Sequence, residues 1–194
     1  VVHHDQVVGI VRKLFETVLA RHARRRRTVR RITLDLDVTD DPTHGGQQLA
    51  FFNGFYGSWC YLPLQAFLTF DRENEQFLCA AALRPGNAPT QQGALTFLKR
   101  IVGRLQERFP KARILVRLDG GFAAPELFEF LDEVGVDYVV AMARNPVLER
   151  EAELDLIIAR VLSDASGQTE HVYTDFAYAA GTWERARRVV CKAE

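Results

Sequence analysis

The chain has 194 residues, of which 47% are hydrophobic, and its 25 basic residues balance 25 acidic ones. This composition supports a sizeable core and excludes a disordered tail. No apolar run approaches the roughly 20 residues that span a bilayer, and the N-terminus lacks a signal-peptide pattern, so we expect no membrane partner. Three cysteines (Cys60, Cys79 and Cys191) match no zinc or disulfide spacing, which favours a reducing, cytoplasmic compartment.

The first 31 residues are strongly basic although the whole chain is neutral. They hold nine Lys or Arg residues against two acidic residues. The following arginines gather at the end of this stretch and are candidate contacts for a DNA backbone: Arg24, Arg25, Arg26, Arg27, Arg30 and Arg31. The alternative is a solvated helix end, where positive charge also suits the helix dipole.

Hydrophobic residues recur with a helical period over residues 5–23, which predicts an amphipathic helix that ends at the arginine run. Residues 32–39 then alternate aliphatic and polar side chains, which predicts a strand. Asp35 and Asp37 share the polar face of this strand because successive side chains point to opposite faces. Residues 41–46, with their Pro and Gly, predict a loop.

Two further strands are expected within residues 61–70 and 76–84, on either side of a polar turn. Pro85 and Gly86 fit the centre of a type II turn. Thr90 is expected to cap the helix that follows.

The second half of the chain alternates strands and helices before it becomes β-rich. A strand over residues 112–119 ends at Asp119, and a helix follows it. The short apolar segment 136–143 predicts a central strand in a sheet covered on both faces. Asn145 is expected to cap the next helix, and the tail from about residue 169 predicts two strands.

This order describes an α/β fold with a sheet of mixed direction, because three meandering strands precede the strand–helix alternation. The ribonuclease H-like fold is one layout with this order. We expect a basic helical lead-in (1–31), a ribonuclease H-like core with flanking helices (32–165), and the start of a C-terminal β-rich insertion segment (166–194).

Two aspartates that end predicted strands are the main candidates for chemistry. Asp37 lies at the end of the first strand and Asp119 at the end of the fourth, and α/β folds place ligands at such carboxyl ends. If these strands are neighbours, a spacing of about 4.8 Å brings both carboxylates within reach of one cation. Such oxygen ligands suit Mg²⁺ or Mn²⁺, with Asp35 as a further candidate ligand. Each aspartate alone could instead be a turn former.

Linked sequence blocks between about Ile32 and Asn145 resemble the DDE transposases of bacterial insertion sequences. The blocks are LDLDVTDDPTHGGQQ, FNGFYG, LRPGNA and ILVRLDGGFAAPELFEFLDEVGVDYVVAMARN. The resemblance implies a ribonuclease H-like catalytic core that cuts and joins DNA with Mg²⁺ or Mn²⁺. It also implies terminal inverted repeats and target DNA as partners, a homodimer as the active assembly, and a nucleoid-associated bacterial protein.

The resemblance also assigns roles by position. Asp37 matches the first catalytic aspartate of the family and Asp119 matches the second, with Asp35 as the alternative for the first. The third catalytic residue of the family is a Glu on a helix after a β-rich insertion, and no Glu of this sequence fits it. We therefore expect the third carboxylate beyond residue 194 and a fragment that is inactive alone.

Other residues in the blocks have two possible roles each. His44 could lie near the scissile phosphate or form a plain turn. Arg84 and Asn87 match the R-P-G-N block and could contact DNA or hold a loop. Trp59 and Trp183 could stack on bases, although packing in a core or at an edge is the commoner role. Two rival functions stay open: an inactive relative that only binds nucleic acid, and a general nuclease of the same fold.

Overall fold

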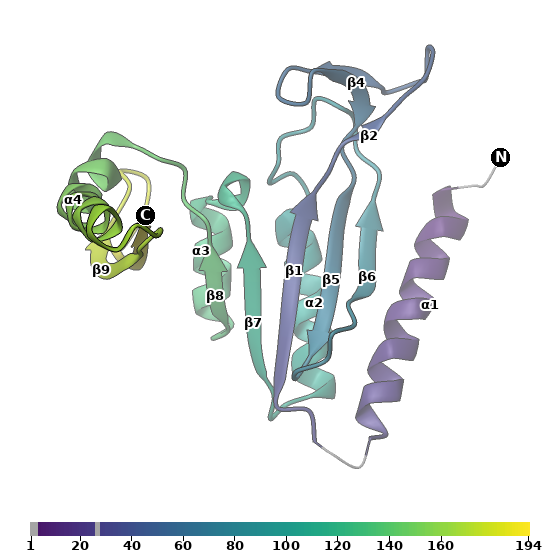
Figure 1. Ribbon diagram of the computed structural model, residues 1–194. Coiled ribbons are helices and arrows are strands. Elements are labelled where there is room, and N and C mark those ends of the chain that lie inside the picture. Colours follow the sequence, from purple (N-terminus) through teal and green to yellow (C-terminus); the bar gives the residue numbers. More distant parts are fainter. Residues whose placement is uncertain (1–3, 26–27) are drawn as a thin grey trace. The chain divides into compact units, whose positions relative to one another are not determined.

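The computed structural model describes residues 4–25 and 28–194, with side chains from residue 11 onward (Figure 1). The chain forms two compact units, Val1–Met142 and Ala143–Glu194. Each unit is described by itself below.

The first unit is built on a five-stranded sheet in the order β6-β5-β1-β7-β8. The strands are β1 (Arg31–Val38), β5 (Leu64–Phe70), β6 (Phe77–Ala82), β7 (Arg113–Leu118) and β8 (Asp137–Val140). β5 is antiparallel to β1 and β6, whereas β7 is parallel to both β1 and β8. This mixed sheet confirms the predicted ribonuclease H-like fold.

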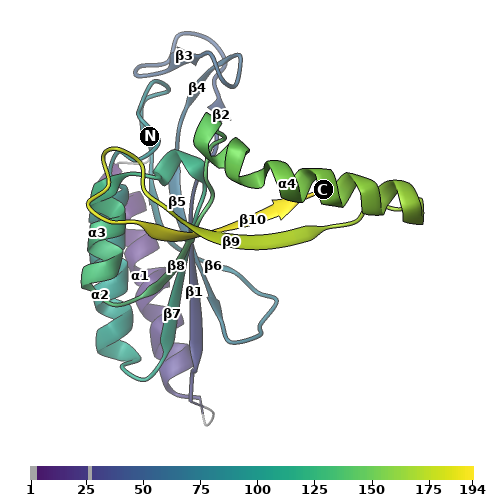
Figure 2. The same ribbon diagram turned by 90° about the vertical axis from the view of Figure 1, so that its left-hand side faces the viewer.

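Three helices cover one face of this sheet: α1 (His4–Ala23), α2 (Ala94–Arg108) and α3 (Pro125–Glu133). Figure 2 shows the sheet nearly edge-on, with all three helices on the same side. The aliphatic residues of β1 point toward them, so that Ile32, Leu34 and Leu36 are buried as the alternation predicted. The polar residues of β1 therefore share the other face, away from these helices.

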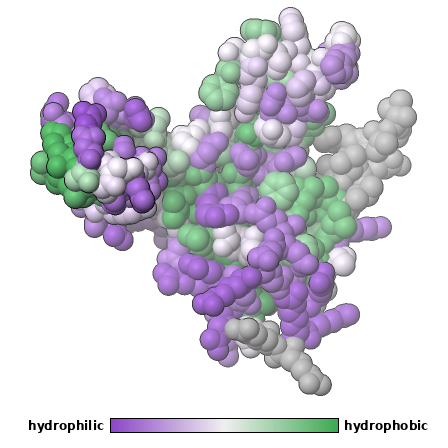
Figure 3. All heavy atoms as spheres, viewed as in Figure 1, coloured by the Kyte–Doolittle hydropathy of each residue, from purple (hydrophilic) through white to green (hydrophobic). Residues whose placement is uncertain are grey.

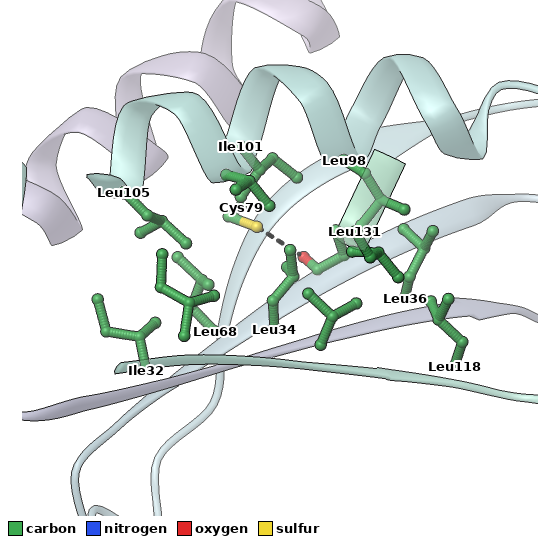
Figure 4. Close-up of a cluster of buried hydrophobic side chains, with 14 of the residues drawn as sticks. Ile32, Leu34, Leu36, Leu68, Cys79, Leu98, Ile101, Leu105, Leu118 and Leu131 are labelled. Atoms are coloured by element: carbon green, nitrogen blue, oxygen red, sulfur yellow. Dashed lines mark hydrogen bonds between the residues drawn. The ribbon is translucent and has the colours of Figure 1, made fainter. Parts of the chain in front are cut away.

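The core of the first unit is closely packed around the middle of the sheet (Figure 4). Cys79 lies within it, and its Sγ donates a hydrogen bond of 3.3 Å to the carbonyl oxygen of Ala66. Burial raises the pKa of the Cys79 thiol to about 12, because the thiolate would be desolvated. This cysteine is a structural thiol, as predicted.

A second, small sheet in the first unit was not predicted. It has the order β2-β4-β3 and consists of β2 (Asp41–Pro42), β3 (Phe51–Asn53) and β4 (Ser58–Tyr61). A short 3₁₀ helix, η1 (Gly120–Phe122), directly follows Asp119. Both features lie at the end of the first unit where β1 and β7 end (Figure 1).

The second unit contains helix α4 (Pro146–Ser166) and a hairpin of β9 (Val172–Tyr178) and β10 (Arg187–Ala193). Asn145 caps α4 as predicted, because its side-chain oxygen accepts hydrogen bonds from two backbone N–H groups of the first turn. The structure groups α4 with this hairpin in the unit 143–194. The sequence had instead suggested that this helix belongs to the ribonuclease H-like core at 32–165.

Three local predictions were wrong. β8 lies at the edge of the sheet, and its Val139 is exposed, although an apolar segment suggested a central strand. α2 begins at Ala94, after Gly93 in a left-handed conformation and without a side-chain cap, so Thr90 does not cap it. Gly86 does not have positive φ, which a type II turn requires in its third residue.

Gly86 serves a different purpose from the predicted turn. A Cβ atom at this position would lie 2.1 Å from the carbonyl oxygen of Cys60 and 2.6 Å from that of Phe51. Only glycine lets the chain pass this close to β3 and β4.

Within residues 4–25 and 28–194, no helix is long and apolar enough to cross a membrane.

His22 on α1 is a buried titratable residue in this core. Its ring stacks on Phe70 with 3.8 Å between the ring centroids, and its Nδ1 donates to the carbonyl of Val18 at 2.8 Å. Burial lowers the pKa of His22, and the nearby positive charges of Arg25 and Arg21 act in the same direction. The hydrogen bond to Val18 and the negative charge of Glu75 raise this pKa; Glu73, which lies 3.2 Å from Nε2, also pairs with Arg25. The cost of burying a charged ring therefore prevails.

We predict that the free energy of unfolding falls as the pH drops below about 6.5, where the unfolded His22 takes up a proton before the folded one does. The stability that the neutral ring provides is complete above this pH. Urea unfolding between about pH 8 and pH 5 measures the effect. His22→Phe, which keeps the ring stacking, should lose part of this pH dependence. An unchanged pH dependence in that variant contradicts the assignment.

Candidate active site

Asp37 and Asp119 lie side by side at the carboxyl ends of two parallel strands. The register of β1 and β7 pairs Leu36 with Leu118; Asp37 follows Leu36 within β1, and Asp119 directly follows the last residue of β7. Adjacent strands are about 4.8 Å apart, so the two Cα atoms are neighbours across the strands. Both residues are exposed. The structure thus brings together the two aspartates that the sequence singled out.

Each of these carboxylates has one oxygen held by the backbone. The N–H of Val38 donates to Oδ1 of Asp37 at 2.8 Å, and the N–H of Gly121 donates to Oδ1 of Asp119 at 2.8 Å. In the described part of the chain, neither Oδ2 atom accepts a hydrogen bond from protein. Each aspartate therefore has one carboxylate oxygen that no described protein group holds.

Asp35 shares the face of Asp37 but is already paired. Arg117 lies directly opposite it in the register, and its Nη2 donates to Oδ2 of Asp35 at 2.8 Å while its Nε bonds Oδ1. Gln76 donates to the same Oδ2 at 3.3 Å. The hydrogen bond with Asp35 raises the pKa of Arg117. A carboxylate with both oxygens engaged is a poorer ligand for a cation than Asp37 or Asp119 is.

Tyr56 of the β3–β4 hairpin lies next to the acidic pair, which sequence reasoning missed. Burial raises the pKa of its hydroxyl, and the negative charges of Asp40, Asp37 and Asp119 raise it further. The hydroxyl lies 3.5 Å from the carbonyl oxygen of Val38. Three carboxylates thus act on one phenol, which stays protonated as a hydrogen-bond donor. Their convergence depends on the small sheet, for which the sequence offered no signal.

Arg84 is buried, with only 6% of its surface exposed. Its Nε donates to the carbonyl of Leu62 at 2.8 Å, and its Nη1 donates to the carbonyls of Pro89, Thr90 and Gln92 at 2.9–3.1 Å. Burial lowers the pKa of Arg84. This geometry supports the loop-scaffolding alternative over a DNA contact.

The loop that Arg84 holds supports the turn after Asp119. A Cβ atom at Gly121 would lie 2.5 Å from Cγ2 of Thr90, so the two residues are in close contact. Gly121 in turn donates the hydrogen bond that fixes Asp119. Arg84, Thr90 and Gly121 therefore form a chain of contacts that positions the Asp119 carboxylate.

The other predicted residues lie outside this cluster. His44 and Asn87 are exposed, and the described structure shows no hydrogen bond to either side chain. Trp59 is exposed on β4, whereas Trp183 is half-buried in the second unit and lies in ring contact with Tyr178.

The described arginines of the basic run lie at the opposite end of β1 from the acidic pair. Arg24, Arg30 and Arg31 are exposed, whereas Arg25 pairs with Glu73; Arg26 and Arg27 lie outside the described residues. Asp37 lies six positions after Arg31 along the strand, which corresponds to roughly 20 Å. The run therefore cannot contact the same phosphate as the aspartates.

The free oxygens of Asp37 and Asp119 are hard ligands that fit a divalent cation such as Mg²⁺. In the described residues, no group of three or more His, Cys, Asp or Glu side chains is placed to hold a metal ion. The site therefore offers two protein ligands, and water or substrate oxygens would have to complete the coordination.

Comparison with known proteins gave two kinds of match. The sequence matches the family Transposase DDE domain group 1 over residues 2–194. A search of curated proteins found no match. The crystal structure of the catalytic domain of Mos1 mariner transposase covers 88% of this chain and 76% of its own, with 14% identity and a TM-score of 0.37.

Two Mos1 complexes gave similar values. The Mos1 mariner paired end complex with Mn covers 76% of this chain at 15% identity and a TM-score of 0.36. The Mos1 strand transfer complex covers 88% at 15% identity and a TM-score of 0.34. This chain spans 46% and 50% of those two chains. The fold assignment accordingly rests on the strand order and direction of the five-stranded sheet.

We predict that Gly121→Ala lowers the free energy of unfolding by about 1–3 kcal/mol, because the added methyl group overlaps the Thr90 side chain. Urea denaturation measures the change. Thr90→Ser in the same chain removes the overlapping methyl group and should restore part of the loss. Gly103→Ala on α2 is the matched control, because no atom lies within 4 Å of its Cβ position. A loss in Gly121→Ala no larger than in this control contradicts the contact.

Proposed function

The chain belongs to the Transposase DDE domain group 1 family, and we propose that it catalyses DNA cleavage and strand transfer at the ends of an insertion sequence. The observation that carries this proposal is the adjacency of Asp37 and Asp119 at the carboxyl ends of two parallel strands. Paired carboxylates in such a position suit metal-dependent reactions of phosphodiesters.

In this proposal Asp37 and Asp119 hold a divalent cation, Mg²⁺ or Mn²⁺, through their free oxygens. When bound, such an ion stabilises negative charge on the phosphate and lowers the pKa of a bound water or hydroxyl. The hydrogen bonds from Val38 and Gly121 fix the orientation of the two carboxylates before DNA arrives. Pre-orientation of this kind reduces the reorganisation needed in the transition state.

Two neighbouring residues would adjust the site for an anionic substrate. Arg117 neutralises Asp35, so the negative charge next to the cation is limited to the residues that bind it. The protonated Tyr56 hydroxyl can donate a hydrogen bond toward a phosphate oxygen near the acidic pair. Water, or a 3′-hydroxyl in strand transfer, would then form a new P–O bond and lose its proton, while the scissile P–O bond breaks and its oxygen leaves as a protonated hydroxyl.

The arginine run would bind the DNA backbone at some distance from the scissile phosphate. Its distance of roughly 20 Å from the aspartates corresponds to about six base pairs along B-DNA. We propose that Arg24, Arg30 and Arg31 contact phosphates there, in the terminal repeat or in target DNA. The resemblance to DDE transposases also supports a homodimer as the active assembly.

A second candidate function is DNA binding without cleavage. It is favoured by one observation: in the described residues no third metal-binding side chain joins Asp37 and Asp119. A relative of this kind would retain nucleic acid through its arginines and leave the phosphodiester intact.

We predict that Mn²⁺ binds this chain and that Asp37→Asn or Asp119→Asn weakens its affinity about tenfold or more, because each removes one charged ligand. Electron paramagnetic resonance of free Mn²⁺ measures the affinity. Asp137→Asn is the matched control, because Asp137 pairs with Arg113 at the other end of the sheet. Asp35→Asn tests the third candidate ligand and should have a smaller effect than the other two. Equal affinities in all four variants contradict a metal site here.

Cleavage of DNA that carries the element ends separates the candidate functions. In a full-length protein that supplies the third carboxylate, Asp119→Asn should abolish cleavage and leave DNA retention nearly unchanged, since it removes a ligand and no DNA contact. Retention without cleavage by that unsubstituted full-length protein supports the binding function. Cleavage that ignores the end sequence indicates a general nuclease of this fold.

A further inference from the structure

The hairpin of β3 and β4 exposes five aromatic side chains. Phe52, Phe55 and Trp59 have 56%, 89% and 59% of their surface exposed, and Phe51 and Tyr56 are also exposed. In Figure 3 a few hydrophobic (green) residues show on the lobe at the top of the view, over this small sheet, among residues coloured white or purple. A concentration of exposed apolar rings indicates a surface that binds something.

This aromatic hairpin (residues 51–61) is held by hydrogen bonds of Asn53, both within the hairpin and to Gly86. The side-chain amide of Asn53 donates to the carbonyl of Gly86 at 2.8 Å, and its oxygen accepts from the N–H groups of Phe55 and Tyr56 at 3.0 and 3.3 Å. The Phe52 and Trp59 rings meet edge to face, with centroids 6.3 Å apart. The rings are thus presented on an ordered scaffold, which limits the entropy lost on binding.

The aromatic hairpin also lies beside the acidic pair. Figure 1 places β4 just beyond the carboxyl end of β1. Tyr56 belongs to the hairpin, and its hydroxyl lies 3.5 Å from the carbonyl oxygen of Val38, the residue after Asp37. A ligand whose phosphate reaches Asp37 and Asp119 therefore has its neighbouring groups within reach of the hairpin.

The chemistry of the surface indicates which of those groups it binds. Residues 45–70 contain no Asp, Glu, Lys or Arg. Such a segment has no charge for backbone phosphates, so it suits a neutral, flat ligand. Nucleobases have such faces, and aromatic side chains stack on them with little regard to sequence. In a base-paired duplex these faces are covered by neighbouring bases.

We propose that the aromatic hairpin, through Phe52, Phe55 and Trp59, binds unpaired bases of the DNA strand next to the scissile phosphate. This inference rests on the proposed function for its substrate, DNA, but concerns a different surface. The hairpin holds the strand end open by stacking, while the aspartates act on the phosphate beside it.

The test compares the affinity of the chain for a labelled oligo-dT strand and for the same strand in a duplex, without divalent metal. Phe55→Ala and Trp59→Ala should each weaken single-strand binding roughly tenfold, since one stacked ring is lost. Duplex binding should change much less. Phe55→Tyr and Trp59→Phe, which keep a ring, should retain most of the affinity. In a Trp183→Phe background, oligo-dT should quench the fluorescence of Trp59.

Leu49→Ala is the matched control, because Leu49 precedes β3 and is 56% exposed but has no ring. Its affinity for oligo-dT should equal that of the unsubstituted chain. If Phe55→Ala and Trp59→Ala bind oligo-dT as tightly as the unsubstituted chain does, the proposal is overturned. It is also overturned if Leu49→Ala loses as much affinity as the two ring variants. If the ring variants alter only self-association or protein binding, the surface binds protein and the proposal is overturned.

The outcome is independent of the metal site. Because oligo-dT binding is measured without divalent metal, Asp119→Asn should leave it unchanged. If the chain binds oligo-dT through its rings but does not bind Mn²⁺, the proposed function fails and the stacking proposal stands. If it binds Mn²⁺ but the ring variants bind oligo-dT normally, only the stacking proposal fails. Unfolding measurements on Phe55→Ala keep the result interpretable, since a side chain this exposed contributes little to stability.

Discussion

The parallel pairing of β1 with β7 is the constraint on which the candidate site depends. Its register is fixed by burial, because Leu34 and Leu36 of β1 and Val116 and Leu118 of β7 all point into the core. A shift by one residue would bring polar side chains into that core. The same apolar contacts that stabilise the sheet therefore place Asp37 beside Asp119.

Much of this arrangement could be predicted from the sequence, and the reason is local periodicity. The alternation along β1 fixes which face carries Asp35 and Asp37 without reference to any other segment. The cap at Asn145 is equally local, since its side chain bonds the next backbone N–H groups. Features that depend on one or two neighbours in the chain are visible in a single sequence.

The features that were missed depend on contacts between distant segments. β8 is as apolar as a central strand, and only the pairing of the whole sheet shows that it is an edge. Thr90 has the chemistry of a helix cap, but it packs against Gly121, which lies 31 residues away in the chain. Arg84 belongs to a motif that suggests a surface role. Its guanidinium is instead buried and donates hydrogen bonds to four backbone carbonyls. Such roles follow from tertiary packing and have no periodic signature.

The distribution of charge along the first unit has a consequence for how ionic strength acts on its two ends. Arg30 and Arg31 precede or begin β1, whereas residues 45–70 carry no formal charge. Contacts of the arginines with a polyanion release condensed counterions and weaken steeply as salt is added. Contacts of the uncharged segment release none. Rising salt would therefore weaken the contacts of a polyanion with the arginines at the amino end of β1 first. Its contacts with the uncharged segment at the carboxyl end would persist.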